Sequence, residues 1–285
     1  MSVPVSIADA IAETTARLRA VSESARLDAE ILIARAIDMP RSYVFAHPED
    51  ELDADAVARL EGTVQRRMSG EPMAYISGFK EFWSLELMVS PATLVPRPET
   101  EILVDRALRE IPRKADWPIL DLGTGSGAIA LAIASDRPLS KVTATDISAD
   151  ALAIAQQNAR QLNLANVEFL QGDWIAPVAG QTFRIVTSNP PYVREGDPYL
   201  DSLQAEPDLA LTAGPGGLEA IETLARDCRP IIDAEGMLFL EHSAEQREAV
   251  ADILTAYGWG SIRCYDDYAG LPRVTSAHPT ASETP

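Results

Sequence analysis

The sequence predicts an α/β fold, in which a mostly parallel β-sheet carries helices on both faces and follows a separate helical domain. From Pro118 onward, apolar segments typical of strands alternate with helical segments, and this alternation indicates a parallel sheet. Residues 1–70 instead show apolar side chains at helical spacing only. Regions with such different patterns should fold around different cores, so we expect two domains.

Three amphipathic helices are predicted in the first domain, over residues 7–18, 27–37 and 53–68. Each helix must bury its apolar face against a partner, and the short connections that carry Pro40 and Pro48 favour a small helical bundle. The spacing of the apolar residues leaves the role of this domain open. It could dock a substrate, or it could support folding or dimerisation.

Residues 71–96 are predicted to form a β-hairpin linker, because glycine and proline bound a segment of aromatic and alternating apolar residues. The second domain is expected over residues 97–277. Its first helix should begin at Pro98, since proline suits the first helical position and the glutamates that follow complement the helix dipole. Residues 278–285, with the sequence HPTASETP, are expected to be a disordered tail.

Seven strands are predicted in the second domain. They span residues 119–122, 142–146, 167–171, 184–188, 237–241, 262–265 and 273–276, and the helices between them include 149–162 and 244–257. Only the segment DDYAGLP joins the last two strands. It is too short for a parallel crossover, so those two strands should pair antiparallel.

The composition argues against several kinds of partner and location. The chain has 24 Lys and Arg against 43 Asp and Glu, a net charge of −19, and should be repelled by nucleic acid and by anionic membranes. No run of 18 apolar residues is present, and the first residues do not resemble a secretory signal. Cys228 and Cys264 are too few for a disulfide framework, so a cytoplasmic setting is expected. The three histidines lack the spacing of metal ligands, so no metal site is expected.

A glycine-rich loop follows the first predicted strand of the sheet. Its residues are Gly123, Thr124, Gly125, Ser126 and Gly127. Glycine lets the backbone approach a ligand closely, and the helix that follows presents free N–H groups. Asp146, at the end of the next strand, could bind ribose hydroxyls. With Ala128, the loop also fits the dinucleotide fingerprint G-x-G-x-x-G/A, so the loop by itself does not choose between cofactors.

The third strand is followed by a carboxylate and an aromatic residue, Asp173 and Trp174. An aromatic face and a carboxylate suit adenine, whose amino group donates hydrogen bonds. The alternative is a helix-capping Asp beside a core Trp. Together with the loop and Asp146, the pair favours an adenosine-containing cofactor.

The fourth strand ends in the motif NPPY. Two prolines hold the backbone extended, so the Asn189 side-chain oxygen and the Pro190 carbonyl can both accept hydrogen bonds from one NH2 group. Tyr192 can stack on the planar group that carries this NH2. We therefore expect Asn189, Pro190 and Tyr192 to be the catalytic residues of a methyl transfer to a planar amine or amide, which would proceed by positioning and electrostatics.

In this order, GTGSG, Asp146, GDW and NPPY resemble the class I S-adenosylmethionine-dependent methyltransferases that modify nitrogen. Other segments are similar to the PrmC/HemK family, the release factor glutamine methyltransferases, over residues 10–276. They are LDAEILIARAI, GEPMAYISGFKEFW, LVPRPETE, EPDLAL and DYAGLPRV. NPPY alone is shared with DNA adenine methyltransferases, whereas RPETE and GEPMAYISGFKEFW are much more specific to this family.

The resemblance implies a helical N-terminal domain, a hairpin linker and a Rossmann-like seven-stranded methyltransferase domain with an antiparallel last hairpin. It also implies S-adenosylmethionine as cofactor and, as substrate, the side-chain amide of the Gln in the Gly-Gly-Gln motif of peptide chain release factors. The implied site residues are Gly123 to Gly127 and Asp146 at the cofactor, Asp173 and Trp174 beside the adenine, Asn189 at both cofactor and substrate, and Pro190, Pro191 and Tyr192 at the Gln pocket.

Two other functions fit parts of the pattern. A DNA or RNA amino-methyltransferase would share NPPY, but the acidic composition weighs against it. A nicotinamide-dependent oxidoreductase or a nonenzymatic nucleotide-binding module would use the glycine loop but has no role for NPPY. Arg97 could contact a protein substrate or form an ion pair at the start of its helix. His242 is expected to be a packing residue.

Overall fold

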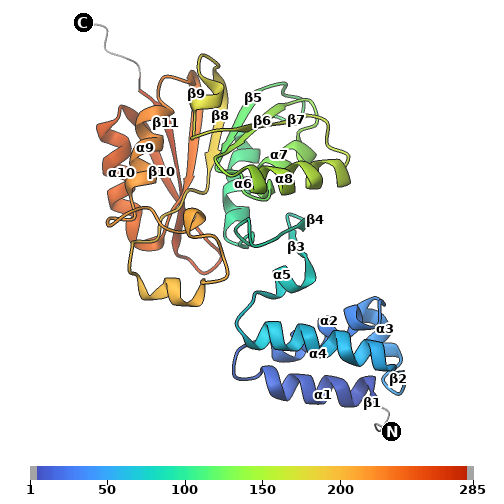
Figure 1. Ribbon diagram of the computed structural model, residues 1–285. Coiled ribbons are helices and arrows are strands. Elements are labelled where there is room, and N and C mark those ends of the chain that lie inside the picture. Colours follow the sequence, from blue (N-terminus) through green and yellow to red (C-terminus); the bar gives the residue numbers. More distant parts are fainter. Residues whose placement is uncertain (1–4, 281–285) are drawn as a thin grey trace, which may run out of the picture. The chain divides into compact units, whose positions relative to one another are not determined.

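The computed structural model describes residues 5–280 and divides the chain into two compact units, Met1–Gly78 and Phe79–Pro285 (Figure 1). The first unit contains β1 (Val5–Ser6), α1 (Ile7–Leu18), α2 (Ala25–Ala36), α3 (Arg41–Ala46), β2 (Glu51–Leu52), α4 (Ala54–Met68) and α5 (Met73–Ser77). The division falls inside the segment predicted as a linker, because α5 packs against α2 and α4 of the first unit. No helix in the described part of the chain is long and apolar enough to cross a membrane.

α2 is the central helix of the first unit and packs against α1, α3 and α4. Unlike an amphipathic surface helix, it is buried on most sides and includes two buried carboxylates, Asp28 and Glu30. Asp28 accepts a hydrogen bond from Arg67 Nε at 2.9 Å, and Glu30 accepts bonds from two arginines. Burying either charge without a partner would cost on the order of several kcal/mol in lost hydration. These ion pairs offset that cost.

The prediction of helices alone in the first unit was wrong in one detail. β1 and β2 pair antiparallel, Val5 with Leu52 and Ser6 with Glu51. Strands of two residues are too short to show a period of two, so the sequence pattern does not reveal them.

The second unit is a seven-stranded sheet with helices on both faces, preceded by a hairpin. Its elements are β3 (Phe79–Phe82), β4 (Leu85–Met88), α6 (Thr100–Glu110), β5 (Pro118–Leu122), α7 (Ala128–Asp136), β6 (Lys141–Asp146), α8 (Ala149–Gln161), β7 (Val167–Gln171), β8 (Phe183–Ser188), α9 (Glu219–Asp227), β9 (Ile232–Glu241), α10 (Arg247–Ala256), β10 (Trp259–Asp266) and β11 (Pro272–Pro279). Short 3₁₀ helices lie at Ala176–Val178, Pro198–Ser202, Asp208–Ala210 and Ala244–Gln246.

The strand order is β10-β11-β9-β8-β5-β6-β7. Within it, the strands β9, β8, β5, β6 and β7 run parallel to one another. β11 pairs antiparallel with both β9 and β10, which confirms the predicted antiparallel end of the sheet. Residues that alternate along each strand point to opposite faces, as Ile119 and Leu120 do on β5. Ile119 packs in the core under α6, α7 and α8, and Leu120 packs in the core under α9 and α10.

The predicted strands are all present, and their ends differ from prediction by a few residues. β9 begins at Ile232 rather than 237, and the predicted helix 244–257 begins with a 3₁₀ turn before α10. The predicted start of the disordered tail, at residue 278, is too early. His278 and Pro279 of β11 pair with β10, and Thr280 donates a hydrogen bond to the Gly258 carbonyl. The rest of that tail, 281–285, lies outside the described residues.

The β3–β4 hairpin is fastened to the sheet domain by one buried side chain, Asn158 on α8. Its Oδ1 accepts a hydrogen bond from the Met88 amide at 2.7 Å, and its Nδ2 donates to the carbonyls of Met88 at 3.0 Å and Ser126 at 2.9 Å. Asn158 is fully buried, so each of these backbone groups would lack a partner without it. One amide therefore connects the hairpin, α8 and the end of the glycine loop.

We expect Asn158→Ala to lower the free energy of unfolding by about 2–4 kcal/mol, because buried backbone groups would lose their partners. Urea unfolding followed by circular dichroism measures this change. Gln157→Ala, an exposed position on the same helix, is the matched control and should change stability by less than about 0.5 kcal/mol. Equal stability of the two variants would contradict the anchoring role of Asn158.

Candidate active site

The site lies where the carboxyl ends of the parallel strands meet. β5 and β8 are neighbours, and the strand order reverses between them, which opens a crevice at this edge of an α/β sheet. Two cavities lie here, of about 260 and 160 Å³, and Asn189 lines both. The larger cavity includes Gly123, Gly125, Asp146, Asp173, Trp174, Asn189 and Pro191 among its lining residues. The smaller one includes Arg97, Asn189, Pro190, Tyr192, Glu241 and Arg273.

The glycine loop is held open by its conformation and by Asp146. Gly123, Gly125 and Gly127 all have positive φ, of 69°, 57° and 86°. At Gly127 a Cβ atom would also lie 2.9 Å from the Leu131 side chain, so only glycine fits there. The Gly125 amide donates to the Asp146 carboxylate at 2.8 Å, which fixes the loop at the mouth of the larger cavity.

Asp146, at the end of β6, holds two backbone amides and lines the larger cavity. One carboxylate oxygen accepts from Gly125 N and the other from Ser148 N, at 2.9 Å. Each carboxylate oxygen can accept more than one hydrogen bond, so both retain capacity toward the cavity that Asp146 lines. A pair of ribose hydroxyls is the kind of ligand that such an acceptor suits.

Two of the predicted loop residues face the protein rather than the cavity. Thr124 is buried and donates to Asp121 Oδ2 at 2.6 Å, and Ser126 is buried with its carbonyl bonded to Asn158. Asp121 also accepts from Thr187 Oγ1 at 2.9 Å. Complete burial raises the pKa of Asp121 to about 7, although both hydroxyl donors act to lower it. The loop thus rests on a buried polar cluster.

Trp174 and Asp173 also line the larger cavity, just after the end of β7. Trp174 has a positive φ of 42°, and its carbonyl accepts a hydrogen bond from Thr145 Oγ1 at 3.0 Å. Its half-buried ring lies against Gly123, where a Cβ would be 3.4 Å from ring carbon Cζ3. Asp173 is exposed at the rim. The ring and the carboxylate are both accessible to a ligand in this cavity.

The NPPY motif is divided between the two cavities. Pro191 lines the larger cavity, Pro190 and Tyr192 line the smaller one, and Asn189 lines both. Asn189 Nδ2 donates to Thr100 Oγ1 at 3.2 Å, which places the NH2 end of this amide against α6 and turns Oδ1 away from it. The motif therefore forms the partition between the two cavities and carries an acceptor at it.

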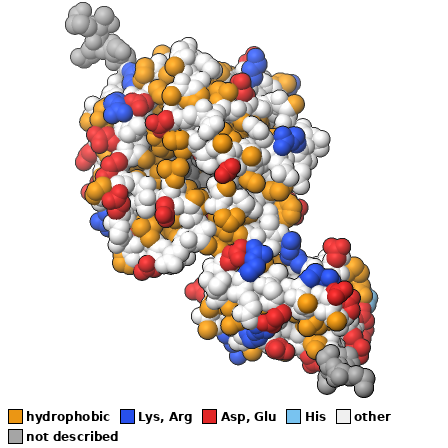
Figure 2. Space-filling model, in the orientation of Figure 1, with side chains coloured by type: hydrophobic (Ala, Val, Ile, Leu, Met, Phe, Trp, Pro, Cys, Tyr) orange, Lys and Arg blue, Asp and Glu red, His pale blue; other side chains and the backbone are white. Residues whose placement is uncertain are grey.

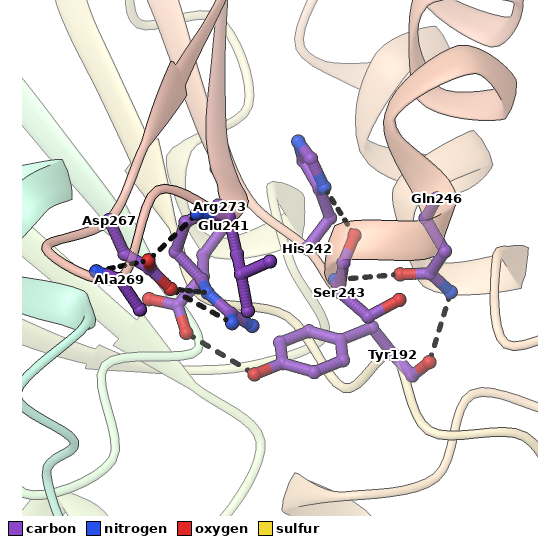
Figure 3. Close-up of polar contacts among 9 residues, drawn as sticks. Tyr192, Glu241, His242, Ser243, Gln246, Asp267, Ala269 and Arg273 are labelled. Carbon is purple, nitrogen blue, oxygen red and sulfur yellow. Dashed lines mark hydrogen bonds and ion pairs between the residues drawn. The ribbon is translucent and has the colours of Figure 1, made fainter.

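Tyr192 is fixed at both ends. Gln246 Nε2 donates to its backbone carbonyl at 3.1 Å and also to the Gly217 carbonyl at 2.8 Å. The Tyr192 hydroxyl donates to Glu241 Oε1 at 3.3 Å (Figure 3). Burial and the nearby Glu241 carboxylate raise the pKa of Tyr192 far above its ordinary value, so the hydroxyl stays protonated.

Several residues of the smaller cavity were not predicted from the sequence. Glu241 is the last residue of β9 and is 1% exposed, and Arg273 on β11 is held by Asp267 at 3.2 Å (Figure 3). Thr100 is the partner of Asn189 from α6. For Glu241, the signal in the sequence is a carboxylate that ends an otherwise apolar strand at the ligand-binding edge. Arg273 and Thr100 lie on segments that come close to Tyr192 and Asn189 because of the strand order in the sheet.

The structure also places Arg97 and His242. Arg97 lines the smaller cavity and also forms an ion pair with Glu206, at 2.5 Å, so both expected roles are compatible with its position. His242 is fully buried, with Nε2 2.8 Å from Thr275 Oγ1 and Nδ1 2.8 Å from the Ser243 carbonyl. Burial lowers the pKa of His242, which fits a neutral packing residue.

The chain is similar to known methyltransferases over nearly its whole length. Residues 9–78 match the family model of the PrmC N-terminal domain, and residues 113–255 match that of a methyltransferase domain. The release factor glutamine methyltransferase of Coxiella burnetii is 41% identical over 273 residues, 96% of this chain and 99% of that one. The same enzyme of Escherichia coli is 43% identical over 265 residues, 92% and 95% of the two chains.

Solved structures agree on the fold. A 16S rRNA N2 G1207 methyltransferase of Thermus thermophilus, solved in complex with AdoMet and guanosine, has a TM-score of 0.52 at 16% identity, covering 70% of this chain and 49% of that one. At this identity the likeness concerns the fold alone. The sequence relatives, which extend across both units, show more: the chain belongs to the release factor glutamine methyltransferase family.

Proposed function

We propose that this enzyme transfers a methyl group from S-adenosylmethionine to the side-chain amide nitrogen of the Gln in the Gly-Gly-Gln motif of peptide chain release factors. The observation that carries the proposal is the position of Asn189, which lines both cavities. A group that borders both can align a methyl donor in one cavity with an amide in the other. The names of the relatives supply the substrate class.

The larger cavity fits the cofactor by the chemistry of its donors and acceptors. Asp146 offers carboxylate oxygens to ribose hydroxyls, Trp174 offers an aromatic face to adenine, and Asp173 can accept from the adenine amino group. Most of the lining is apolar, as in small-molecule sites that exclude water. When bound, S-adenosylmethionine supplies a methyl group that its positive sulfonium already activates.

The smaller cavity fits a planar amide. Asn189 Oδ1 and the Pro190 carbonyl are acceptors for its two N–H groups, and Tyr192 provides a ring to stack on. An amide nitrogen is a poor nucleophile because its lone pair is delocalised into the carbonyl. Holding both N–H groups fixes the nitrogen for in-line attack, and it favours the change of geometry at nitrogen as the new bond forms. The methyl–sulfur bond would break as the N–C bond forms, which leaves the sulfur neutral, and the proton would leave nitrogen for solvent during or after this step.

The helical unit is proposed to dock the protein substrate, and the place of action is proposed to be the cytoplasm, where release factors act. Methylation of DNA or RNA is the less supported alternative. In Figure 2, hydrophobic side chains cover much of the middle of the visible face of the second unit, and Lys and Arg side chains are scattered around it rather than gathered. Together with the net charge of −19, this arrangement disfavours contact with a phosphate backbone.

Replacing Asp146 tests the cofactor site. Asp146→Ala should weaken S-adenosylmethionine binding by about 10- to 100-fold, because it removes the ribose acceptor and releases the Gly125 amide. Isothermal titration calorimetry measures the affinity. Asp150→Ala, an exposed carboxylate four residues further along, is the control for charge and should bind normally. Unchanged affinity in Asp146→Ala would refute this assignment.

Replacing Asn189 tests the chemistry. Asn189→Ala removes one acceptor, and kcat should fall by about 10²–10³-fold, as for the loss of one preorganised polar contact. Asn189→Asp keeps an acceptor but adds a negative charge near the sulfonium, which stabilises the ground-state cation, so it should also be strongly impaired. Single-turnover kinetics at saturating cofactor measure both. Near-normal methyl transfer by Asn189→Ala would show that the positioning mechanism is wrong.

Removing the helical unit tests docking. A chain of residues 79–285 should show a much higher KM for the intact release factor but a nearly unchanged KM for a short Gly-Gly-Gln peptide. The reason is that remote contacts help only a substrate large enough to make them. Circular dichroism and cofactor binding serve as controls for folding. Equal losses on protein and peptide would indicate a stabilising role for the helical unit instead.

A further inference from the structure

The exposed hydrophobic side chains of the second unit are unevenly distributed over the sheet. Six large ones are between 48% and 84% exposed among its described residues, and they are Leu139, Ile147, Tyr199, Leu209, Tyr268 and Leu271. Single exposed hydrophobic residues are ordinary on a protein surface, whereas a group of them at one place marks an interaction surface. Their positions along the strands show whether they form such a group.

Strand direction places four of these residues with respect to the two edges of the sheet. Ile147 directly follows β6, and Tyr199 and Leu209 lie in the loop after β8. All three are therefore at the carboxyl edge, where both cavities lie, and Tyr199 lines the smaller cavity itself. Leu139 comes directly before β6 and so lies at the opposite edge.

The turn between β10 and β11 is also at the carboxyl edge. β11 runs antiparallel to β9, and Val274 near its start pairs with Glu241, the last residue of β9. Residues 267–271 come before β11, so they lie beyond the carboxyl end of β9. Arg273 on β11 lines the smaller cavity, so the turn continues from the wall of that cavity to its rim. Five of the six exposed side chains thus surround the site.

Asp267 holds this turn in one shape. Its backbone amide donates to the Leu271 carbonyl at 2.8 Å, and its carbonyl accepts from the Gly270 amide at 2.9 Å. Its Oδ1 accepts from the amides of Ala269 at 2.9 Å and Leu271 at 3.0 Å. Its Oδ2 accepts from Arg273 at 3.2 Å, as Figure 3 shows. The carboxylate is only 5% exposed, so water competes little for these bonds.

Two apolar side chains project from this fixed turn into solvent. Tyr268 is 84% exposed, the most of the six, and Leu271 is 48% exposed. The Tyr268 side chain has no hydrogen-bond or ring partner among residues 5–280, so nothing in that part of the chain explains its presence. An aromatic ring on a rigid turn can bury a large area at a low cost in conformational entropy, and such rings are enriched in protein interfaces.

The size of the smaller cavity indicates what covers this rim. A cavity of about 160 Å³ can take a side chain but not the body of a protein, so the rest of a protein substrate must lie outside it. Glycine offers no side chain to bind, so the two glycines beside the substrate glutamine add little contact of their own. Contacts at the rim must then be made by residues that flank the Gly-Gly-Gln segment.

We propose that the β10–β11 turn is a docking element for the release factor, in which Tyr268 and Leu271 pack against apolar side chains that flank the Gly-Gly-Gln segment. This inference rests on the proposed function, which names the substrate. The contacts lie away from the reacting atoms and are the same before and during methyl transfer. They therefore strengthen substrate binding without lowering the barrier of the chemical step, and their loss raises KM but leaves kcat unchanged.

The experiment measures steady-state methylation of two substrates by the full chain. One is the intact release factor, and the other is a short peptide that contains Gly-Gly-Gln but no hydrophobic residue. Tyr268→Ala and Leu271→Ala should each raise KM for the intact protein by about 5- to 20-fold, as for truncation of an interface anchor, with kcat within about twofold of wild type. KM for the peptide should stay within about twofold, because the peptide cannot reach the turn.

Two further variants make the result specific. Tyr268→Phe keeps the ring and should retain most of the affinity for the intact protein. Leu139→Ala removes a side chain that is 58% exposed at the opposite edge of the sheet, and it should behave as wild type on both substrates. Neither Tyr268 nor Leu271 lines the cofactor cavity, so unchanged calorimetric affinity for S-adenosylmethionine shows that the variants are folded.

Three results would overturn the proposal. In the first, KM for the intact release factor is unchanged in both alanine variants. In the second, KM rises equally for protein and peptide, which would mean that the turn acts on the cavity and not on the flanking residues. In the third, sedimentation shows a dimer that Tyr268→Ala dissociates, which would assign the surface to a second copy of the chain. Failure of the proposed function looks different, since the wild-type enzyme would then methylate neither substrate.

Discussion

The pairing of β5 with β8 is the constraint on which the whole site depends. These strands are parallel and in register, with Leu122 beside Ser188, and Ser188 Oγ donates to the Leu122 carbonyl at 2.8 Å. The glycine loop begins one residue after Leu122, and NPPY begins one residue after Ser188. This register therefore sets the glycine loop and Asn189 at the same level of the sheet. Because the strand order reverses at this pair, the two segments border a crevice rather than a continuous surface.

Buried polar groups then fix the loops that the sheet brings together. Asp121 supports the glycine loop through Thr124, Asp146 holds the Gly125 amide, and Asn158 joins the end of the loop to the β3–β4 hairpin. Each of these side chains has hydrogen-bond partners that offset the cost of its burial. Loops fixed in this way need no reorganisation when a ligand binds, and such preorganisation is the main source of catalytic advantage in a reaction that proceeds by positioning.

The smaller cavity differs, because its polar groups are only partly satisfied. Among the described residues, Glu241 has a hydrogen-bond partner for Oε1 and none for Oε2, and burial raises its pKa to about 7. Its neighbours in the cavity include Tyr192, from the loop after β8, and Arg273, from β11. A site that must accept an amide from another protein benefits from acceptors that are fixed before the substrate arrives.

The sequence by itself predicted the strands along the chain of the second unit and singled out the glycine loop, Asp146, Trp174 and NPPY, because each has a local pattern of periodicity, turn residues or side-chain chemistry. It also indicated the family, to which the chain belongs. Only the tertiary structure decided that Thr124 and Ser126 face inward, and that Thr100, Glu241 and Arg273 surround Tyr192 and Asn189. Of these contacts, Asn189–Thr100 joins residues 89 positions apart and Tyr192–Glu241 joins residues 49 positions apart. No local pattern encodes such pairs, since they arise from the order in which the strands pack.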